Sequence, residues 1–117
     1  MPAANLMMTV RDAAPGVRVV DIKGEITAFS EEILTNAHEE ASAGDVKAVI
    51  LNFTDLEYMN SGGIGLLVTT LIRAQRSGHS LCAYGLTDHY RQIFSLTRLD
   101  EAIGIFEDEA SAVASFS

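Results

Sequence analysis

Short apolar runs alternate along the chain with amphipathic stretches whose apolar residues recur at helical intervals. The short apolar runs, of which residues 48–53 are rich in β-formers, favour strands, and the amphipathic stretches favour helices. The pattern predicts strands at residues 7–11, 17–26, 49–53, 81–84 and 103–106. It predicts helices at residues 31–43, 61–77 and 88–96, and a last helix from residue 108 onward.

The order of these elements predicts an α/β fold. Asp12-Ala13-Ala14-Pro15-Gly16 separates the first two strands, and its Pro-Gly pair is a turn signal, so we expect a β-hairpin there. The later strands alternate with helices, and such βαβ units form parallel sheets with right-handed crossovers. We therefore expect a mixed, mostly parallel β-sheet with an antiparallel edge and about four helices. We expect residues 1–117 to form a single domain, because this length suits one hydrophobic core.

Glycines and capping residues mark the expected ends of the helices. Gly44 and Gly78 follow the first and second helical stretches, where glycine commonly ends a helix. Thr87 or Asp88 is expected to cap the third helix. Asp108 or Glu109 would complement the dipole of the last helix.

The composition excludes several classes of protein. Hydrophobic residues make up 48% of the chain, which argues against disorder, and no apolar run approaches the roughly 18 residues of a membrane-spanning helix. The formal net charge of -8 opposes binding to nucleic acid. The N-terminus lacks the features of a secretory signal, and the single Cys82 cannot form an internal disulfide. We therefore expect a soluble, cytoplasmic protein with no nucleic-acid or membrane partner.

The most informative stretch is Asp55-Leu56-Glu57-Tyr58-Met59-Asn60-Ser61-Gly62-Gly63-Ile64-Gly65, which follows an apolar strand and opens the second helix. Ser61 lies at this junction, near the expected N-cap, where a hydroxyl can accept a hydrogen bond from a backbone amide two or three residues on. Three glycines within four residues, Gly62, Gly63 and Gly65, would let the backbone of another protein approach closely.

These residues resemble the signature of the STAS domain family of anti-sigma factor antagonists, which is a strand, then Asp-Ser-[Ser/Thr]-Gly-x-Gly, then a helix. Val19–Ile26 is similar to the second strand of that family. Ile93–Asp100 and Ile103–Phe106 are similar to its third helix and last strand, so the likeness covers nearly the whole chain. It departs at Asn60, where the best-known phosphorylated members carry an aspartate.

The resemblance implies a non-enzymatic phospho-switch. Its unphosphorylated form would bind an anti-sigma factor of the histidine-kinase-like ATPase family and thereby free the sigma factor. That partner, or a related kinase, would phosphorylate Ser61, and a metal-dependent serine phosphatase would reverse the reaction. Nucleotide and magnesium would belong to the kinase, so we expect no cofactor in this chain. The docking surface expected from the resemblance comprises Asn60, Ser61, Gly62, Gly63 and Gly65, with Thr27 and Ala28 from the loop after the second strand.

Two other functions stay open. The first is a scaffold or adaptor that uses the same surface without phosphorylation, which the departure at Asn60 keeps possible. The second is a serine hydrolase, because Asn60-Ser61-Gly62-Gly63 faintly resembles the nucleophile segment of trypsin-like proteases and His38, His79 or His89 could supply a base. The hydrolase is disfavoured, because the chain is short, is mixed α/β and lacks a Gly-x-Ser-x-Gly elbow.

The remaining chemistry-bearing residues favour structural roles. The three histidines are scattered, and we expect them to be solvated and to form no metal site. Cys82 lies in an apolar strand and is expected to be a small core residue. A dinucleotide-binding loop is also disfavoured, because Gly63-Ile64-Gly65 lacks a third glycine and we expect a long connection between the strand and these glycines.

Overall fold

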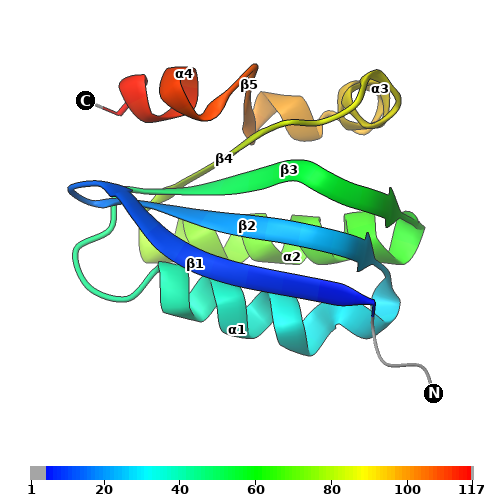
Figure 1. Ribbon diagram of the computed structural model, residues 1–117, viewed down its shortest axis with the longest axis horizontal. Coiled ribbons are helices and arrows are strands. Elements are labelled where there is room, and N and C mark those ends of the chain that lie inside the picture. Colours follow the sequence, from blue (N-terminus) through cyan, green and yellow to red (C-terminus); the bar gives the residue numbers. More distant parts are fainter. Residues whose placement is uncertain (1–4, 117) are drawn as a thin grey trace.

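The computed structural model describes residues 5–116, which form one five-stranded sheet with helices on both faces (Figure 1). The strands are β1 (Leu6–Ala14), β2 (Val17–Ile26), β3 (Ala48–Met59), β4 (Ser80–Tyr84) and β5 (Gly104–Phe106). The helices are α1 (Glu31–Ala41), α2 (Ser61–Ser77), α3 (Asp88–Leu96) and α4 (Glu109–Ala114), with short 3-10 helices η1 (Ala28–Ser30) and η2 (Leu99–Glu101).

The strands follow one another in chain order across the sheet, β1-β2-β3-β4-β5. The first pair is antiparallel and the other three pairs are parallel, so the predicted mixed sheet with an antiparallel hairpin is confirmed. The hairpin turns at Gly16, whose φ of 74° lies in the left-handed region that glycine adopts easily. Figure 1 shows α1 and α2 below the sheet and α3 and α4 above it.

The predicted ends of the helices agree closely with the structure. Gly78 is the C-cap of α2 with a φ of 82°, and Thr87 caps α3 by accepting a hydrogen bond from the amide of Tyr90. Asp108 caps α4 in the same way through the amide of Ser111. The first helix ends earlier than predicted, at Ala41, and Gly44 follows it in the left-handed region.

The third strand is much longer than the sequence pattern predicts. It was expected to end at Phe53, but it runs to Met59, and its parallel pairing with β2 continues to Ile26↔Met59. Two irregularities in that pairing accommodate the extra residues on β3. The expected long connection before the glycines is therefore wrong, because Asn60 alone separates β3 from α2.

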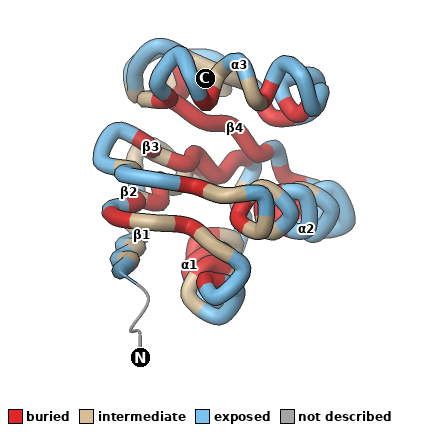
Figure 2. The backbone as a smooth tube through the Cα atoms, turned by 90° about the vertical axis from the view of Figure 1, so that its right-hand side faces the viewer, coloured by how far each residue is buried: buried red, intermediate tan, exposed pale blue. Residues whose placement is uncertain are grey.

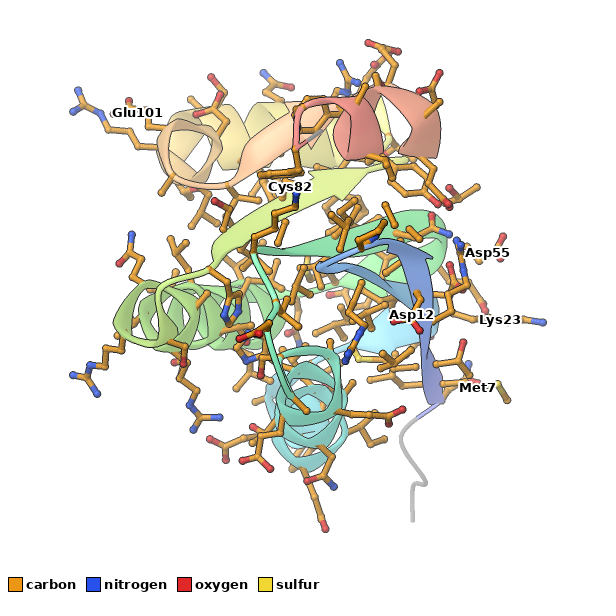
Figure 3. The ribbon with its side chains drawn as sticks, turned by 90° about the vertical axis from the view of Figure 1, so that its left-hand side faces the viewer. Met7, Asp12, Lys23, Asp55, Cys82 and Glu101 are labelled. Carbon is orange, nitrogen blue, oxygen red and sulfur yellow. The ribbon has the colours of Figure 1, made fainter. Side chains whose placement is uncertain are left out.

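The core lies on both faces of the sheet, and Figure 2 shows the buried residues concentrated along the strands. Phe53 of β3 meets Phe94 of α3 edge to face, with ring centroids 6.3 Å apart. Cys82 is buried, as predicted, and burial raises the pKa of its thiol to about 12, so the thiol is inert. Figure 3 shows Cys82 on β4 beneath the layer of α3 and α4, whereas Lys23 and Asp55 point outward.

The expectation that all three histidines are solvated is wrong for two of them. His38 and His79 are only 4% and 6% exposed, and their Nε2 atoms lie 3.0 Å apart. The crossover from α1 through β3 and α2 brings these residues together, although they are far apart in the sequence. His89, at the start of α3, is exposed as expected.

None of the helices within residues 5–116 is long and apolar enough to cross a membrane.

Candidate functional site

Asn60 is the residue that joins β3 to α2, and it caps the helix. Its backbone is extended, and its backbone amide donates a hydrogen bond to the carbonyl of Ile26 at 3.2 Å. Its side-chain Oδ1 accepts a hydrogen bond from the backbone amide of Gly63 at 3.0 Å. The sequence pattern predicts Ser61 near this cap. Because β3 extends to Met59, the extended residue before the helix is Asn60, and Ser61 becomes the first residue inside α2.

Ser61 is exposed at the N-terminal end of α2. Its hydroxyl makes no hydrogen bond within the described part of the chain, so it is not occupied in holding the helix. The first turn of α2 contains no acidic residue. The hydroxyl therefore lies where added negative charge would meet the positive end of a helix dipole and no carboxylate of the same turn.

The loop after β2 folds into η1 and lies beside the start of α2. Thr27 Oγ1 accepts a hydrogen bond from the amide of Phe29 at 3.2 Å, and the amide of Thr27 donates to Ser30 Oγ at 2.9 Å. This reciprocal capping box fixes the turn, and Ser30 is buried beneath it. The structure brings Ala28, which follows Thr27, against Gly62 of α2, although the two segments belong to different elements.

The three glycines of the motif differ in what surrounds them. A Cβ atom at Gly62 would lie 2.8 Å from Cβ of Ala28, and one at Gly63 would overlap the carbonyl oxygen of Ile26. These two glycines are therefore needed for α2 to pack against the end of β2 and η1. Gly65 is exposed and has no atom within 4 Å of an added Cβ, so only this glycine leaves open room for another molecule.

Exposed apolar side chains that the sequence pattern does not predict lie on η1 and α2. Phe29 is 88% exposed at the centre of the fixed η1 turn. Val68 and Ile72 are 39% and 43% exposed on α2. Together with Ser61 and Gly65 they recur at intervals of three and four residues, which places them on one side of the helix. We call these four residues the α2 face: Ser61, Gly65, Val68 and Ile72. The helical spacing was visible in the sequence, but which side of α2 stays uncovered was not.

Two of the histidines considered as a base for Ser61 lie at the other end of α2. His79 follows the C-cap of this 17-residue helix, which is about 25 Å long at 1.5 Å per residue. His38 is paired with His79, so it lies at that end as well. No group of three or more His, Cys, Asp or Glu side chains within residues 5–116 could hold a metal ion.

The fold and this junction match a known family. The family model described as the STAS domain matches residues 9–112, so the chain belongs to the STAS domain family.

The curated relatives and solved structures agree with this assignment. The chain is 26% identical over 92 residues to the anti-sigma-B factor antagonist of Staphylococcus aureus. This match covers 75% of this chain and 82% of the relative. An anti-sigma factor antagonist from Mycobacterium paratuberculosis superposes with a TM-score of 0.75 at 23% identity, over 97% of this chain and 96% of that one. The phosphorylated form of the Bacillus cell fate determinant SpoIIAA superposes with a TM-score of 0.72 at 19% identity, over 95% of this chain and all of that one.

Proposed function

We propose that this protein is an anti-sigma factor antagonist that works by partner switching. In its unphosphorylated form it binds an anti-sigma factor of the histidine-kinase-like ATPase family, and the sigma factor is released. The partner, or a related kinase, then phosphorylates Ser61, and a metal-dependent serine phosphatase removes the phosphate. The proposed switch acts in the cytoplasm, where the sigma factor and ATP are found. The names of the curated relatives, which are anti-sigma-B factor antagonists, support an anti-sigma factor as the partner.

The observation that carries the proposal is the exposure of Ser61 at the start of α2, next to a fixed turn and an open helix face. A kinase needs an accessible hydroxyl on its substrate, and phosphorylation of that hydroxyl must not unfold the substrate. Because Asn60 rather than Ser61 caps the helix, the Ser61 hydroxyl is free for transfer. Phosphorylation adds about 1.5 to 2 negative charges, which the amides and dipole of a helix N-terminus tolerate.

The proposed docking surface has an apolar part and a polar part. Val68 and Ile72 of the α2 face supply apolar area together with Phe29. Backbone and polar groups around the phosphoacceptor come from Thr27, Ala28, Asn60, Ser61 and Gly62. Gly63 contributes by allowing α2 to pack, and Gly65 by leaving room for the partner. An exposed aromatic side chain on a rigid turn loses little conformational freedom on binding, so Phe29 is the expected anchor.

Affinity capture tests the switch. Wild-type, Ser61→Asp and Ser61→Ala proteins are used as baits, and the ATPase-type anti-sigma factor is quantified in each eluate. It should be retained by wild type and Ser61→Ala and lost from Ser61→Asp. Ser95→Asp, which adds the same charge at an exposed position of α3, is the matched control and should retain the partner. Equal retention by Ser61→Asp and wild type would contradict the proposal.

A second pair of variants tests the anchor. Phe29→Ala should weaken binding to the anti-sigma factor by about tenfold or more, since truncation of a buried aromatic anchor commonly costs more than 1.4 kcal/mol. Leu96→Ala removes a side chain that is 77% exposed on α3, so it should leave affinity unchanged. Equal affinities for these two variants would remove Phe29 from the interface.

The second candidate function is a scaffold or adaptor in a signalling assembly that uses the same surface without phosphorylation. Asn60 favours it, because an amide caps the helix but cannot act as a carboxylate base or help to hold a metal ion. Incubation with the cognate kinase and Mg-ATP, followed by mass spectrometry, separates the two functions. Phosphate on Ser61 supports the switch, and an intact complex with unmodified Ser61 supports the adaptor.

A further inference from the structure

A buried hydrogen bond connects the segment that carries Ser61 to a helix on the opposite face of the sheet. The backbone amide of Met59, the last residue of β3, donates to the hydroxyl oxygen of Tyr90 at 2.8 Å. Tyr90 is 8% exposed and Met59 is 4% exposed. Tyr90 lies in the first turn of α3, which sits above the sheet in Figure 1, whereas α2 lies below it.

The course of β3 and β4 explains why a side chain meets the backbone at this point. The parallel pairing of these strands ends at Asn52↔Tyr84, whereas β3 continues to Met59. The chain leaves β4 at Gly85, whose Cα approaches the backbone of Thr54 so closely that a Cβ would lie 2.7 Å from its amide nitrogen. It then enters α3 at Asp88, so the last residues of β3 have α3 rather than β4 on this side. The Tyr90 hydroxyl takes the place that a neighbouring strand would occupy.

We propose that Tyr90 is a positioning residue for Ser61. Its hydroxyl fixes the backbone of Met59, Met59 is followed directly by the cap Asn60, and Ser61 opens α2 from that cap. Through this bond α3 holds the phosphoacceptor segment from the face of the sheet opposite to α2. Its role in partner binding rests on the proposed function of Ser61, whereas the positioning itself is a property of the fold.

Packing supports a rigid connection. Phe94, one turn further along α3, is fully buried and meets Phe53 of β3 edge to face. α3 is thus held against β3 at two points, near the middle of the strand by Phe94 and at its end by Tyr90. A displacement of α3 would shift the backbone of Met59 and the Ser61 junction that follows it. The buried amide of Met59 needs a hydrogen-bond partner, so this backbone cannot easily separate from Tyr90.

The test compares two tyrosines that differ in what their hydroxyls bind. Tyr90→Phe removes the acceptor of the Met59 amide. Tyr84→Phe is the matched control, because Tyr84 is also 8% exposed. Its hydroxyl donates a hydrogen bond to Glu109 Oε1 at 2.9 Å, and this bond does not involve the β3–α2 junction. Hydrogen exchange and the amide NMR spectrum are recorded for both variants. Affinity for the ATPase-type anti-sigma factor is measured alongside, and global stability is measured in urea.

Tyr90→Phe should accelerate exchange at the hydrogen-bonded amides of Met59, Asn60, Gly63 and Ile64 by about tenfold relative to Tyr84→Phe, at comparable global stability. It should shift the Met59 amide resonance and weaken partner binding several-fold, while Tyr84→Phe leaves both unchanged. Equal exchange of these four amides in the two variants would overturn the positioning role. Selective exchange with wild-type affinity would overturn its link to docking. If wild-type protein fails to bind the anti-sigma factor, the proposed function falls, and the exchange comparison still decides whether Tyr90 positions the segment.

Discussion

The Nε2 atoms of His38 and His79 lie 3.0 Å apart in a buried pair that joins the last turn of α1 to the residue after the C-cap of α2. One ring must donate and the other accept at this contact, which two neutral imidazoles can do and two imidazolium ions cannot. Burial lowers the pKa of both side chains, and for His38 the charges of His79 and Arg73 lower it further while Glu39 opposes them. The pair therefore favours the neutral state.

The pair makes stability depend on pH. Since both folded-state pKa values lie below the unfolded value near 6.5, the unfolded chain takes up protons more readily once the pH falls below about 6.5. The contribution of the pair to the free energy of unfolding should be fully present above that pH. It should be lost as the pH drops toward the folded-state pKa values of the two histidines. Urea unfolding between pH 7.5 and 5 measures the slope. Removing the pair by His38→Gln with His79→Gln should flatten it, whereas the exposed His89→Gln should not.

A second prediction separates the cap of α2 from the phosphoacceptor. Asn60→Ala should lower the free energy of unfolding by about 1 kcal/mol, because the amide of Gly63 loses its side-chain acceptor. Ser61→Ala should change it little, since its hydroxyl does not cap the helix, yet it should abolish phosphate incorporation at this position. Urea midpoints and phosphosite mapping check both. A larger stability loss for Ser61→Ala than for Asn60→Ala would contradict the observed capping.

The departure from aspartate at position 60 gives a third prediction. Aspartate is as good an N-cap as asparagine and suits the positive end of the helix, so Asn60→Asp should keep the fold stable. If a carboxylate assists phosphoryl transfer, this substitution should raise the rate at which the cognate kinase phosphorylates Ser61. Initial rates with Mg-ATP measure the effect. An unchanged rate with intact binding would show that the carboxylate is not needed in this protein.

The glycines of the motif give a fourth prediction. Gly63→Leu should destabilise the fold and lose binding in parallel, because its side chain would overlap Ile26 and Met59. Gly65→Leu should leave stability equal or raise it by up to about 1 kcal/mol, because glycine is a poor helix former, yet it should weaken partner binding by about tenfold or more. Binding titrations paired with urea midpoints distinguish the two roles. Full affinity in Gly65→Leu would show that the partner does not approach this side of α2.

The fifth prediction is that phosphorylation of Ser61 acts locally. Charge effects at helix ends are about 0.3 to 1 kcal/mol, and 1 kcal/mol moves the midpoint of a domain of this size by roughly 4 to 8 °C. The thermal midpoints of phosphorylated and unmodified protein should therefore differ by a few degrees at most, while affinity for the partner falls by about tenfold or more. Amide exchange should change only near residues 58–68. Changes spread through the sheet and distant helices would replace a local switch with an allosteric one.

The amino-acid sequence determined the architecture, because its signals are local. The period of apolar residues defined the strands and helices, the Pro15-Gly16 turn defined the hairpin, and Gly78 and Thr87 marked helix ends that the structure retains. The Asn60-Ser61-Gly62-Gly63 segment is likewise a local signal in the sequence. Each of these signals depends on residues within a few positions of one another, and propensity and capping act over that range.

Only the tertiary structure decided how the site is built. The second half of β3 contains the polar residues Asp55 and Glu57, so its sequence pattern does not predict a strand. It is a strand because β2 pairs with it. Because β3 extends to Met59, the cap of α2 is Asn60 rather than Ser61, and Gly63 packs against Ile26. The same extension places the amide of Met59 at the hydroxyl of Tyr90. It is likewise the packing of α1 and α2 on one face of the sheet that pairs His38 with His79. These contacts join residues far apart along the chain, and their free energy depends on distances that no local pattern of residues encodes.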